Sequence, residues 1–355
     1  MPVTDWISSA EAWSAAHPQE TRYLAALGVA VTAILALWLA IALLRLVIRI
    51  WRALQDAGRA RALKLDKAPG YRIVLMKPDG KARGASLRWL ASALDSHLGA
   101  FNFGAPYKVI RLNVLKGGMA PETLARARRR MAVADADLLV WARRKGNRQD
   151  GFEIFGLTRG GGLTPAEAKS FRLNLPARRK DLAGLMPKAA AFLLARQLQP
   201  ALANPQSFRS EKIKLLAEEL GGILDHDGPL PQALRSEIEG AYCASAVHVA
   251  EDAGDLEGLE RVIALSRAHL AEDKVKTNPE RALQARMDLG RALLARASKK
   301  FDTALVQEAI SHLSLVVEAL RTDPTIIRAQ GASDAMFKAQ SMLESRKRFA
   351  VNFGT

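Results

Sequence analysis

The chain has 355 residues and a single cysteine, Cys243, so an internal disulfide and a zinc site built from several cysteines are both excluded. Its six histidines do not recur at metal-binding spacing. Neither a P-loop nor a complete dinucleotide-binding glycine pattern is present. The sequence therefore offers no catalytic constellation, and we expect no metal and no cofactor. Cys243 lies among small residues of a predicted helix and is expected to be a buried packing residue.

Charged side chains are missing altogether from residues 23–44. A helix of this length spans about 33 Å, enough to cross the hydrocarbon core of a bilayer. The apolar run is too long for a secretory signal peptide and lacks its basic start. We therefore predict a transmembrane helix over residues 23–44, after an external segment formed by residues 1–22.

The flanks of this run predict its orientation. Residues 1–22 contain three acidic residues and one basic residue, whereas residues 45–67 contain seven lysines and arginines. The positive-inside rule places the C-terminal side in the cytoplasm, with a bacterial inner membrane as the expected location. We predict a basic juxtamembrane helix over residues 45–68. Arg45, Arg49, Trp51 and Arg52 are its candidate contacts with anionic headgroups, and a solvated linker helix is the alternative.

The formal net charge of +16 favours acidic partners, such as anionic lipid, acidic protein or nucleic acid. Eleven basic residues lie between Arg45 and Arg83, so much of the excess belongs to the membrane-proximal part. Because no aromatic–basic interleaving or known nucleic-acid motif accompanies the basic runs, nucleic acid is not the favoured partner. A membrane-tethered nucleic-acid binder is kept as the third hypothesis.

After the break at residues 68–70, the pattern predicts a small α/β domain over residues 69–180. Short apolar runs predict strands over residues 71–76, 107–114 and 137–141, separated by helices over 86–97 and from Pro121. Such alternation is typical of parallel strands with helical crossovers. Residues 151–157 and 169–175 then predict an antiparallel hairpin, so we expect a mixed sheet.

Residues 181–355 are predicted to form an α-helical domain. The predicted helices cover residues 181–199, 207–225, 231–253, 255–274, 279–297, 303–321 and 324–346. Short connections carrying Gly, Pro or Asp separate them, as in arrays of stacked helix pairs.

Two stretches of the helical part resemble tetratricopeptide-type repeats. Pro279–Ala295 resembles the first helix of such a repeat and Glu308–Leu320 the second. Residues 242–246 together with residues 256–270 resemble a degenerate earlier copy. The resemblance covers about residues 231–346 and implies a groove that binds another protein. The run Ala127–Trp141, followed by a Gly-containing hairpin, resembles TolB-N-like domains at the level of pattern and implies a non-enzymatic role.

Basic residues and glycines follow each of the predicted parallel strands. In such sheets, ligands bind beyond the carboxyl ends of the strands, and helix N-termini there attract anions. This edge is the candidate anion site, and a solvated basic face is the alternative. Its residues are Lys77, Lys81, Arg83, Lys116, Gly117, Gly118, Arg143 and Arg144.

Three functions are compatible with these observations. The leading hypothesis is a membrane-tethered cytoplasmic scaffold or adaptor that binds another protein through a helical-repeat groove. The alternative is a sensor or enzyme for a nucleotide-like anion, which would use the basic edge of the sheet. The sequence does not decide whether the chain is an enzyme, although the lack of a catalytic set favours a binding role.

Overall fold

The computed structural model describes residues 15–16, 18–77, 83–144, 152–160, 162–175, 185–226, 230–271, 278–322 and 331–352. The chain divides into two compact units, residues 1–59 and 60–355, and each is described by itself.

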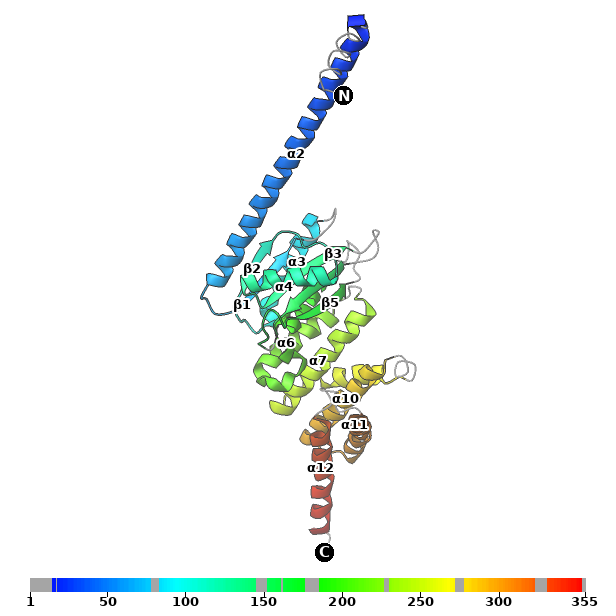
Figure 1. The fold of residues 1–355 in the computed structure, drawn as a ribbon. Helices are drawn as coiled ribbons and strands as arrows, with labels where there is room; N and C mark the ends of the chain where they lie inside the picture. The colour runs from blue at the N-terminus through cyan, green and yellow to red at the C-terminus, as the bar shows by residue number, and fades with distance from the viewer. Residues whose placement is uncertain are drawn as a thin grey trace. The chain divides into compact units, whose positions relative to one another are not determined.

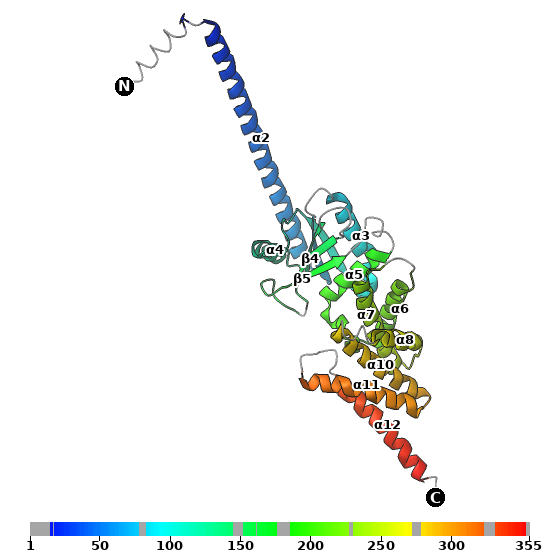
Figure 2. The same ribbon diagram turned by 90° about the vertical axis from the view of Figure 1, so that its right-hand side faces the viewer.

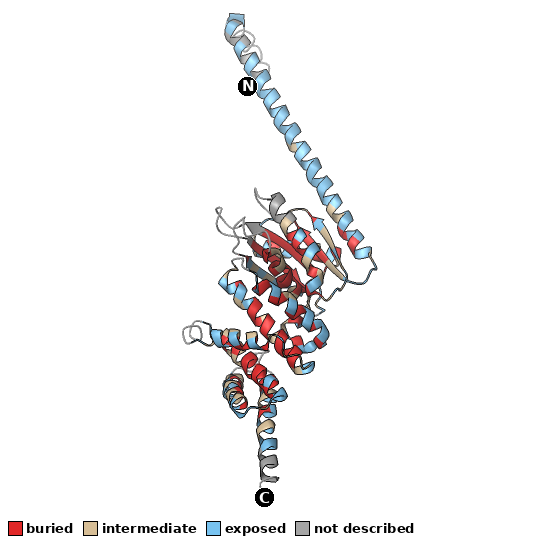
Figure 3. Cartoon of the chain, turned by 180° about the vertical axis from the view of Figure 1, so that it is seen from behind, coloured by how far each residue is buried: buried red, intermediate tan, exposed pale blue. Residues whose placement is uncertain are grey.

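Helix α2 runs without a break from Pro18 to Leu65. No proline interrupts it before Pro69, so the predicted apolar helix and its basic continuation form one element. In the first unit its large apolar side chains are exposed, for example Leu35 at 61% and Trp38 at 68% (Figure 3). A long helix that is apolar on every face and uncovered by protein is unusual in water.

Length and composition select two helices able to cross a membrane, Val29–Leu65 within α2 and α11, Thr303–Thr322. None of the most apolar window of the first is buried, against 22% for α11. α11 packs against α10 (Pro279–Lys299) and α12 (Ala332–Asn352). Its apolar residues Leu313 and Val316 are buried in that contact layer, which accounts for part of its apolar character.

The second unit contains a mixed five-stranded sheet in the order β2-β1-β3-β4-β5. β1 (Tyr71–Met76) pairs in parallel with β2 (Tyr107–Leu112) and β3 (Leu138–Arg144). β4 (Phe152–Thr158) and β5 (Lys169–Leu175) add an antiparallel hairpin. The predicted parallel core with a hairpin is confirmed. β2 is two residues shorter than predicted and β3 extends three residues further.

Alternation along the strands separates two buried layers. Ile73 and Leu75 face α3 (Arg83–Phe101) and α5 (Leu185–Leu198), while Val74 and Met76 face α4 (Pro121–Ala134). Figure 2 shows α4 and α5 on opposite sides of β4 and β5. The last turns of α2 join the α4 layer through Ala60 and Leu63, so the predicted basic segment 45–68 ends inside the second unit.

The remaining helices follow one another, and each packs against the next (Figure 1). Two short 3-10 turns, Pro200–Ala203 and Pro205–Ser207, lead from α5 into them. The helices are α6 (Ser210–Leu224), α7 (Gln232–Asp252), α8 (Leu259–His269), α10, α11 and α12. Every predicted helix of this part has a counterpart, so a helical region after a small mixed sheet is confirmed.

Helix boundaries differ from the prediction where turn chemistry intervenes. α8 begins at Leu259 rather than at 255, because Asp255 Oδ1 accepts a hydrogen bond from Glu257 N at 3.0 Å and Gly258 has φ +84°. An Asx turn followed by a left-handed glycine precludes a helix at these residues. α12 begins at Ala332, and the predicted start at 324 lies outside the described residues.

Candidate functional site

The predicted basic edge exists as a feature of the topology. β1, β2 and β3 run in parallel, so their carboxyl ends, after Met76, at Leu112 and at Arg144, lie at one edge of the sheet. Lys77 and Lys116 follow two of these ends, Arg83 begins α3, and Arg143 is the second-last residue of β3. Lys81 and the side chains of Arg83, Arg143 and Arg144 lie outside the described part of the chain.

The described residues of this edge already have structural partners. Lys77 Nζ donates to Asn113 Oδ1 at 3.3 Å, and Arg130 Nη1 donates to the Asn113 carbonyl at 2.8 Å. The Gly117 carbonyl accepts from Trp141 Nε1 at 3.2 Å. A Cβ on Gly118 would lie 3.5 Å from the Phe155 ring, which is ordinary van der Waals contact.

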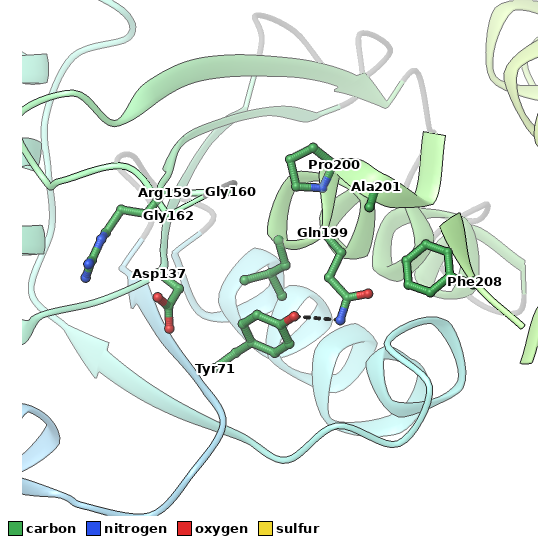
Figure 4. A pocket seen from close by; sticks show the side chains of 10 residues that line it. Tyr71, Asp137, Arg159, Gly160, Gly162, Gln199, Pro200, Ala201 and Phe208 are labelled. Atoms are coloured by element: carbon green, nitrogen blue, oxygen red, sulfur yellow. Dashed lines mark hydrogen bonds between the residues drawn. The ribbon is translucent and has the colours of Figure 1, made fainter. Parts of the chain in front are cut away.

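A cavity of about 520 Å³ lies at the opposite edge, where β1 and β3 begin and β4 ends. Figure 4 shows its walls. They come from segments far apart in sequence: Tyr71, Asp137, Arg159, Gly160, Gly162, Leu198, Gln199, Pro200, Ala201 and Phe208. The loop after β4 comes close to the end of α5, since a Cβ on Gly160 would lie 2.6 Å from Pro200 Cγ. Only glycine fits at that position.

One polar pair faces this cavity (Figure 4). Gln199 Nε2 donates to the Tyr71 hydroxyl at 2.6 Å. Gln199 Oε1 is buried and accepts no hydrogen bond from the described residues. A buried amide oxygen without a donor is costly, so a ligand donor at this point would be stabilising.

The charged groups of the cavity wall are already paired. Asp135 accepts from Arg72 Nη1 at 2.5 Å and from Arg159 Nη1 at 2.7 Å. Asp137 Oδ2 accepts from the Arg72 backbone amide at 2.8 Å. The backbone conformation of Asp135, with φ +48°, ends α4 and turns its carboxylate toward both arginines. These interactions fix the edge of the sheet and leave no described acid–base pair ready for catalysis.

Cys243 and His248 are packed in the interior of the helical region. Cys243 is fully buried, as expected, and burial raises the pKa of its thiol beyond the range in which a thiolate forms. His248 Nε2 lies 3.0 Å from the Phe208 carbonyl. The described part of the chain contains no group of three or more His, Cys, Asp or Glu side chains arranged for a metal ion.

Sequence reasoning missed Tyr71, Gln199 and Phe208 as cavity residues. Tyr71 was visible only as the first residue of a strand, and Gln199 as a polar residue at the end of an apolar helix. Their meeting depends on how α5 folds back on the sheet, which no local pattern encodes.

Comparison with models of protein families, with curated proteins and with solved structures finds no match to this chain. The fold and the geometry of its cavities are therefore the basis for a functional proposal.

Proposed function

We propose that this protein is a single-pass membrane protein whose tethered second unit acts as an adaptor for another protein. The single observation that carries the proposal is that no residue in the most apolar stretch of α2 is buried by protein. A bilayer is the solvent in which such a surface is stable. Under this proposal residues 23–44 span an inner membrane, with the N-terminus outside and the folded unit in the cytoplasm.

Membrane extraction tests the tether. The wild-type chain should remain with membranes after alkaline carbonate washing. The double variant Leu35→Asp and Leu39→Asp should be extracted, because each acidic residue near the helix centre costs about 2.5–3.5 kcal/mol of insertion free energy. Both side chains are exposed in the first unit, so the folded second unit keeps its contacts. Extraction of the wild-type chain would remove the basis of the proposal.

Protease protection tests the orientation. With basic residues on its C-terminal flank, the chain should keep residues 60–355 inaccessible to protease added outside intact spheroplasts, and lose that protection after permeabilisation. Cleavage of the folded unit from the outside would reverse the proposed topology.

The stacked helices support the adaptor role. α7, α8, α10, α11 and α12 pack in succession, as in tetratricopeptide-like arrays that bind proteins on an extended surface. Leu315 on α11 is 50% exposed and Phe337 on α12 is 74% exposed, although their helices pack together. We propose that α11 and α12 form the partner-binding surface, since large apolar side chains left uncovered often mark such surfaces.

In-membrane cross-linking of the full-length chain tests this surface. Leu315→Ser with Phe337→Ser should abolish a specific cross-linked species formed by the wild-type chain. The control is Val133→Ser on α4, which removes an apolar side chain that is 46% exposed from another helix. An unchanged cross-linking pattern in the double variant would place the surface elsewhere.

The second candidate is a sensor for a small molecule, and it is favoured by the buried Gln199 Oε1, which has no hydrogen-bond partner among the described residues. Thermal unfolding of the full-length protein against a panel of nucleotides separates the two ligand positions. A shift abolished by Lys81→Ala and Arg83→Ala would favour the basic edge. A shift abolished by Gln199→Leu would favour the cavity. If no nucleotide shifts the unfolding temperature, the adaptor role is favoured.

A further inference from the structure

A second cavity, also of about 520 Å³, lies among three of the stacked helices. The first turns of α7, the end of α8 and the start of α10 form its walls. Its principal polar residues are Arg235, Ser236, Glu239, His269, Asn278 and Arg281. Two arginines and one carboxylate make the described wall basic, while its size exceeds that of a single ion.

The carboxylate of Glu239 is fully engaged. Its Oε1 accepts from Arg235 Nε at 3.0 Å, and its Oε2 lies 2.8 Å from His269 Nε2. Burial alone would raise the pKa of Glu239, but these two hydrogen bonds outweigh it and hold the pKa below its usual range. Glu239 therefore compensates the charge of Arg235, and its ion pairs among the described residues are with Arg235 and His269 rather than with Arg281.

Arg281 carries the charge that remains. Its Nε and Nη1 atoms are buried and have no hydrogen-bond partner in the described part of the chain. Buried guanidinium groups in proteins are normally paired. The next carboxylate along α10, Asp288, accepts from Gln284 at 2.8 Å and does not line the cavity.

A glycine of α7 makes room for this guanidinium. A Cβ built on Gly240 would lie 2.6 Å from Arg281 Nη1 and 3.0 Å from its Cζ. The group therefore rests against the helix backbone, where only a hydrogen atom intervenes. At the other end of the residue, Asn278 caps α10 by accepting from the Arg281 backbone amide at 3.1 Å. Arg281 is thus held at the first turn of α10, whose N-terminus adds positive potential.

We propose that this cavity binds an oxyanion, a phosphate or carboxylate group of a small molecule, with Arg281 as its principal ligand. A planar guanidinium can donate to two oxygens of such a group, and Arg281 lines the cavity from which a ligand would approach it. The remaining volume accommodates the organic part of the ligand. This inference concerns a site outside the proposed partner surface and does not depend on the membrane tether.

Calorimetric titration of the detergent-solubilised full-length protein tests the site. Inorganic phosphate and succinate are the two probes, each added at constant ionic strength with potassium chloride as the balancing salt. At least one probe should bind saturably to the wild-type protein. Binding of phosphate alone assigns a phosphate group, and binding of succinate alone assigns a carboxylate.

Two variants probe Arg281 independently. Arg281→Gln removes the charge, and the Kd should rise by about tenfold or more, as expected for loss of a charge-assisted hydrogen bond. Gly240→Ala keeps every side chain of the cavity wall but displaces the guanidinium, and it should raise the Kd in the same way. Because alanine is favoured over glycine inside a helix and the group displaced is the end of a flexible side chain, α7 should stay folded.

The matched control is Arg321→Gln, which removes the same charge from an exposed position on α11. The Arg321 side chain is 75% exposed, and the Kd of the Arg321→Gln protein for each probe should equal that of the wild type. Equal affinities in the Gly240→Ala, Arg281→Gln and wild-type proteins would overturn the proposal, as would purely linear, non-saturating heats with both probes.

Discussion

Gly290 lets α10 and α11 approach closely, and replacing it tests how these helices pack. A Cβ at this position would lie 2.7 Å from Leu313 Cγ and 3.4 Å from the Ala309 carbonyl oxygen. Leu313 is fully buried between α10 and its neighbours. The added methyl group would therefore meet a branched side chain that has little room to move, and we expect Gly290→Ala to destabilise the second unit.

Two opposing terms set the size of this effect. Alanine inside a helix is favoured over glycine by about 1 kcal/mol. Overpacking a filled core costs about 1–3 kcal/mol. The net change in the free energy of unfolding should therefore be a loss of about 0–2 kcal/mol. Leu313→Ala alone should cost about 2–5 kcal/mol, because it removes a buried side chain and leaves a void.

The double variant separates the effect of the steric contact with Leu313 from the effect of alanine's higher helix propensity. Once Leu313 is alanine, the methyl group on residue 290 meets no branched side chain. Adding Gly290→Ala should then stabilise the Leu313→Ala protein by up to about 1 kcal/mol, so the two changes should couple by about 1–3 kcal/mol. The matched control is Gly222→Ala on the exposed side of α6, where the nearest atom is Lys188 Nζ at 3.8 Å. It should stabilise by about 0.5–1 kcal/mol.

Denaturant unfolding followed by far-ultraviolet circular dichroism measures the wild type and the four variants under one detergent condition. The reasoning is refuted if Gly290→Ala stabilises the protein as much as Gly222→Ala does, or if the two changes at the helix contact are additive.

Three further outcomes are expected. Burial, followed by the charge of Asp288, raises the pKa of the Cys243 thiol, so the thiol reacts only when the structure opens. With an opening free energy of ~5 kcal/mol, a disulfide reagent at pH 8 should label the native protein about a thousandfold or more slowly than the urea-unfolded chain. Rapid labelling of the native protein would place the thiol at the surface. Burial raises the pKa of Glu239, but hydrogen bonds lower it further, so the pKa in the folded protein lies below the ordinary value of 4.5. The Glu239 carboxylate therefore stabilises the fold fully above pH 4.5, and this stabilisation is lost as the pH falls through the folded pKa. Glu239→Gln should accordingly lose stability at pH 7 and approach the wild type in acid, and a gap independent of pH would contradict this. Trp141→Phe should cost about 0.5–1.5 kcal/mol in denaturant unfolding by removing the hydrogen bond from the indole to the Gly117 carbonyl, whereas an unchanged midpoint would mean that water replaces the indole.

The order of elements could be predicted because each leaves a local signal. The apolar run at residues 71–76, the glycines at 117–118 and the proline at 121 predict a strand, a loop and a helix start, and all three occur. Boundaries were missed where a side chain acts on the backbone. Asp255 forms a turn that delays α8, a contact that periodicity does not report.

The cavities could not be predicted, since their walls are assembled by tertiary packing. Tyr71 and Gln199 are 128 positions apart and share a hydrogen bond because α5 returns across the sheet. The basic edge of the sheet was predicted because parallel strands bring their ends together by rule. The contact of the Gly117 carbonyl there depends on Trp141, whose ring stacks on that of Phe155 with centroids 5.8 Å apart, and no local pattern reports it.

The large positive charge of the chain helps to rank its basic residues. With 52 basic and 36 acidic residues, many lysines and arginines must lack a carboxylate, and at the surface water solvates them at little cost. A basic cluster at a loop is therefore weak support for a ligand. In the helical region, by contrast, two of the less exposed arginines are paired with glutamates, Arg196 with Glu237 and Arg291 with Glu251. Arg281 departs from that pattern, because its buried nitrogens lack partners among the described residues while a cavity lies beside them. The excess of basic residues explains guanidinium nitrogens that water solvates, but it does not explain the two buried nitrogens of Arg281. The cavity at the start of α10 is therefore a stronger candidate for a ligand than the basic edge of the sheet.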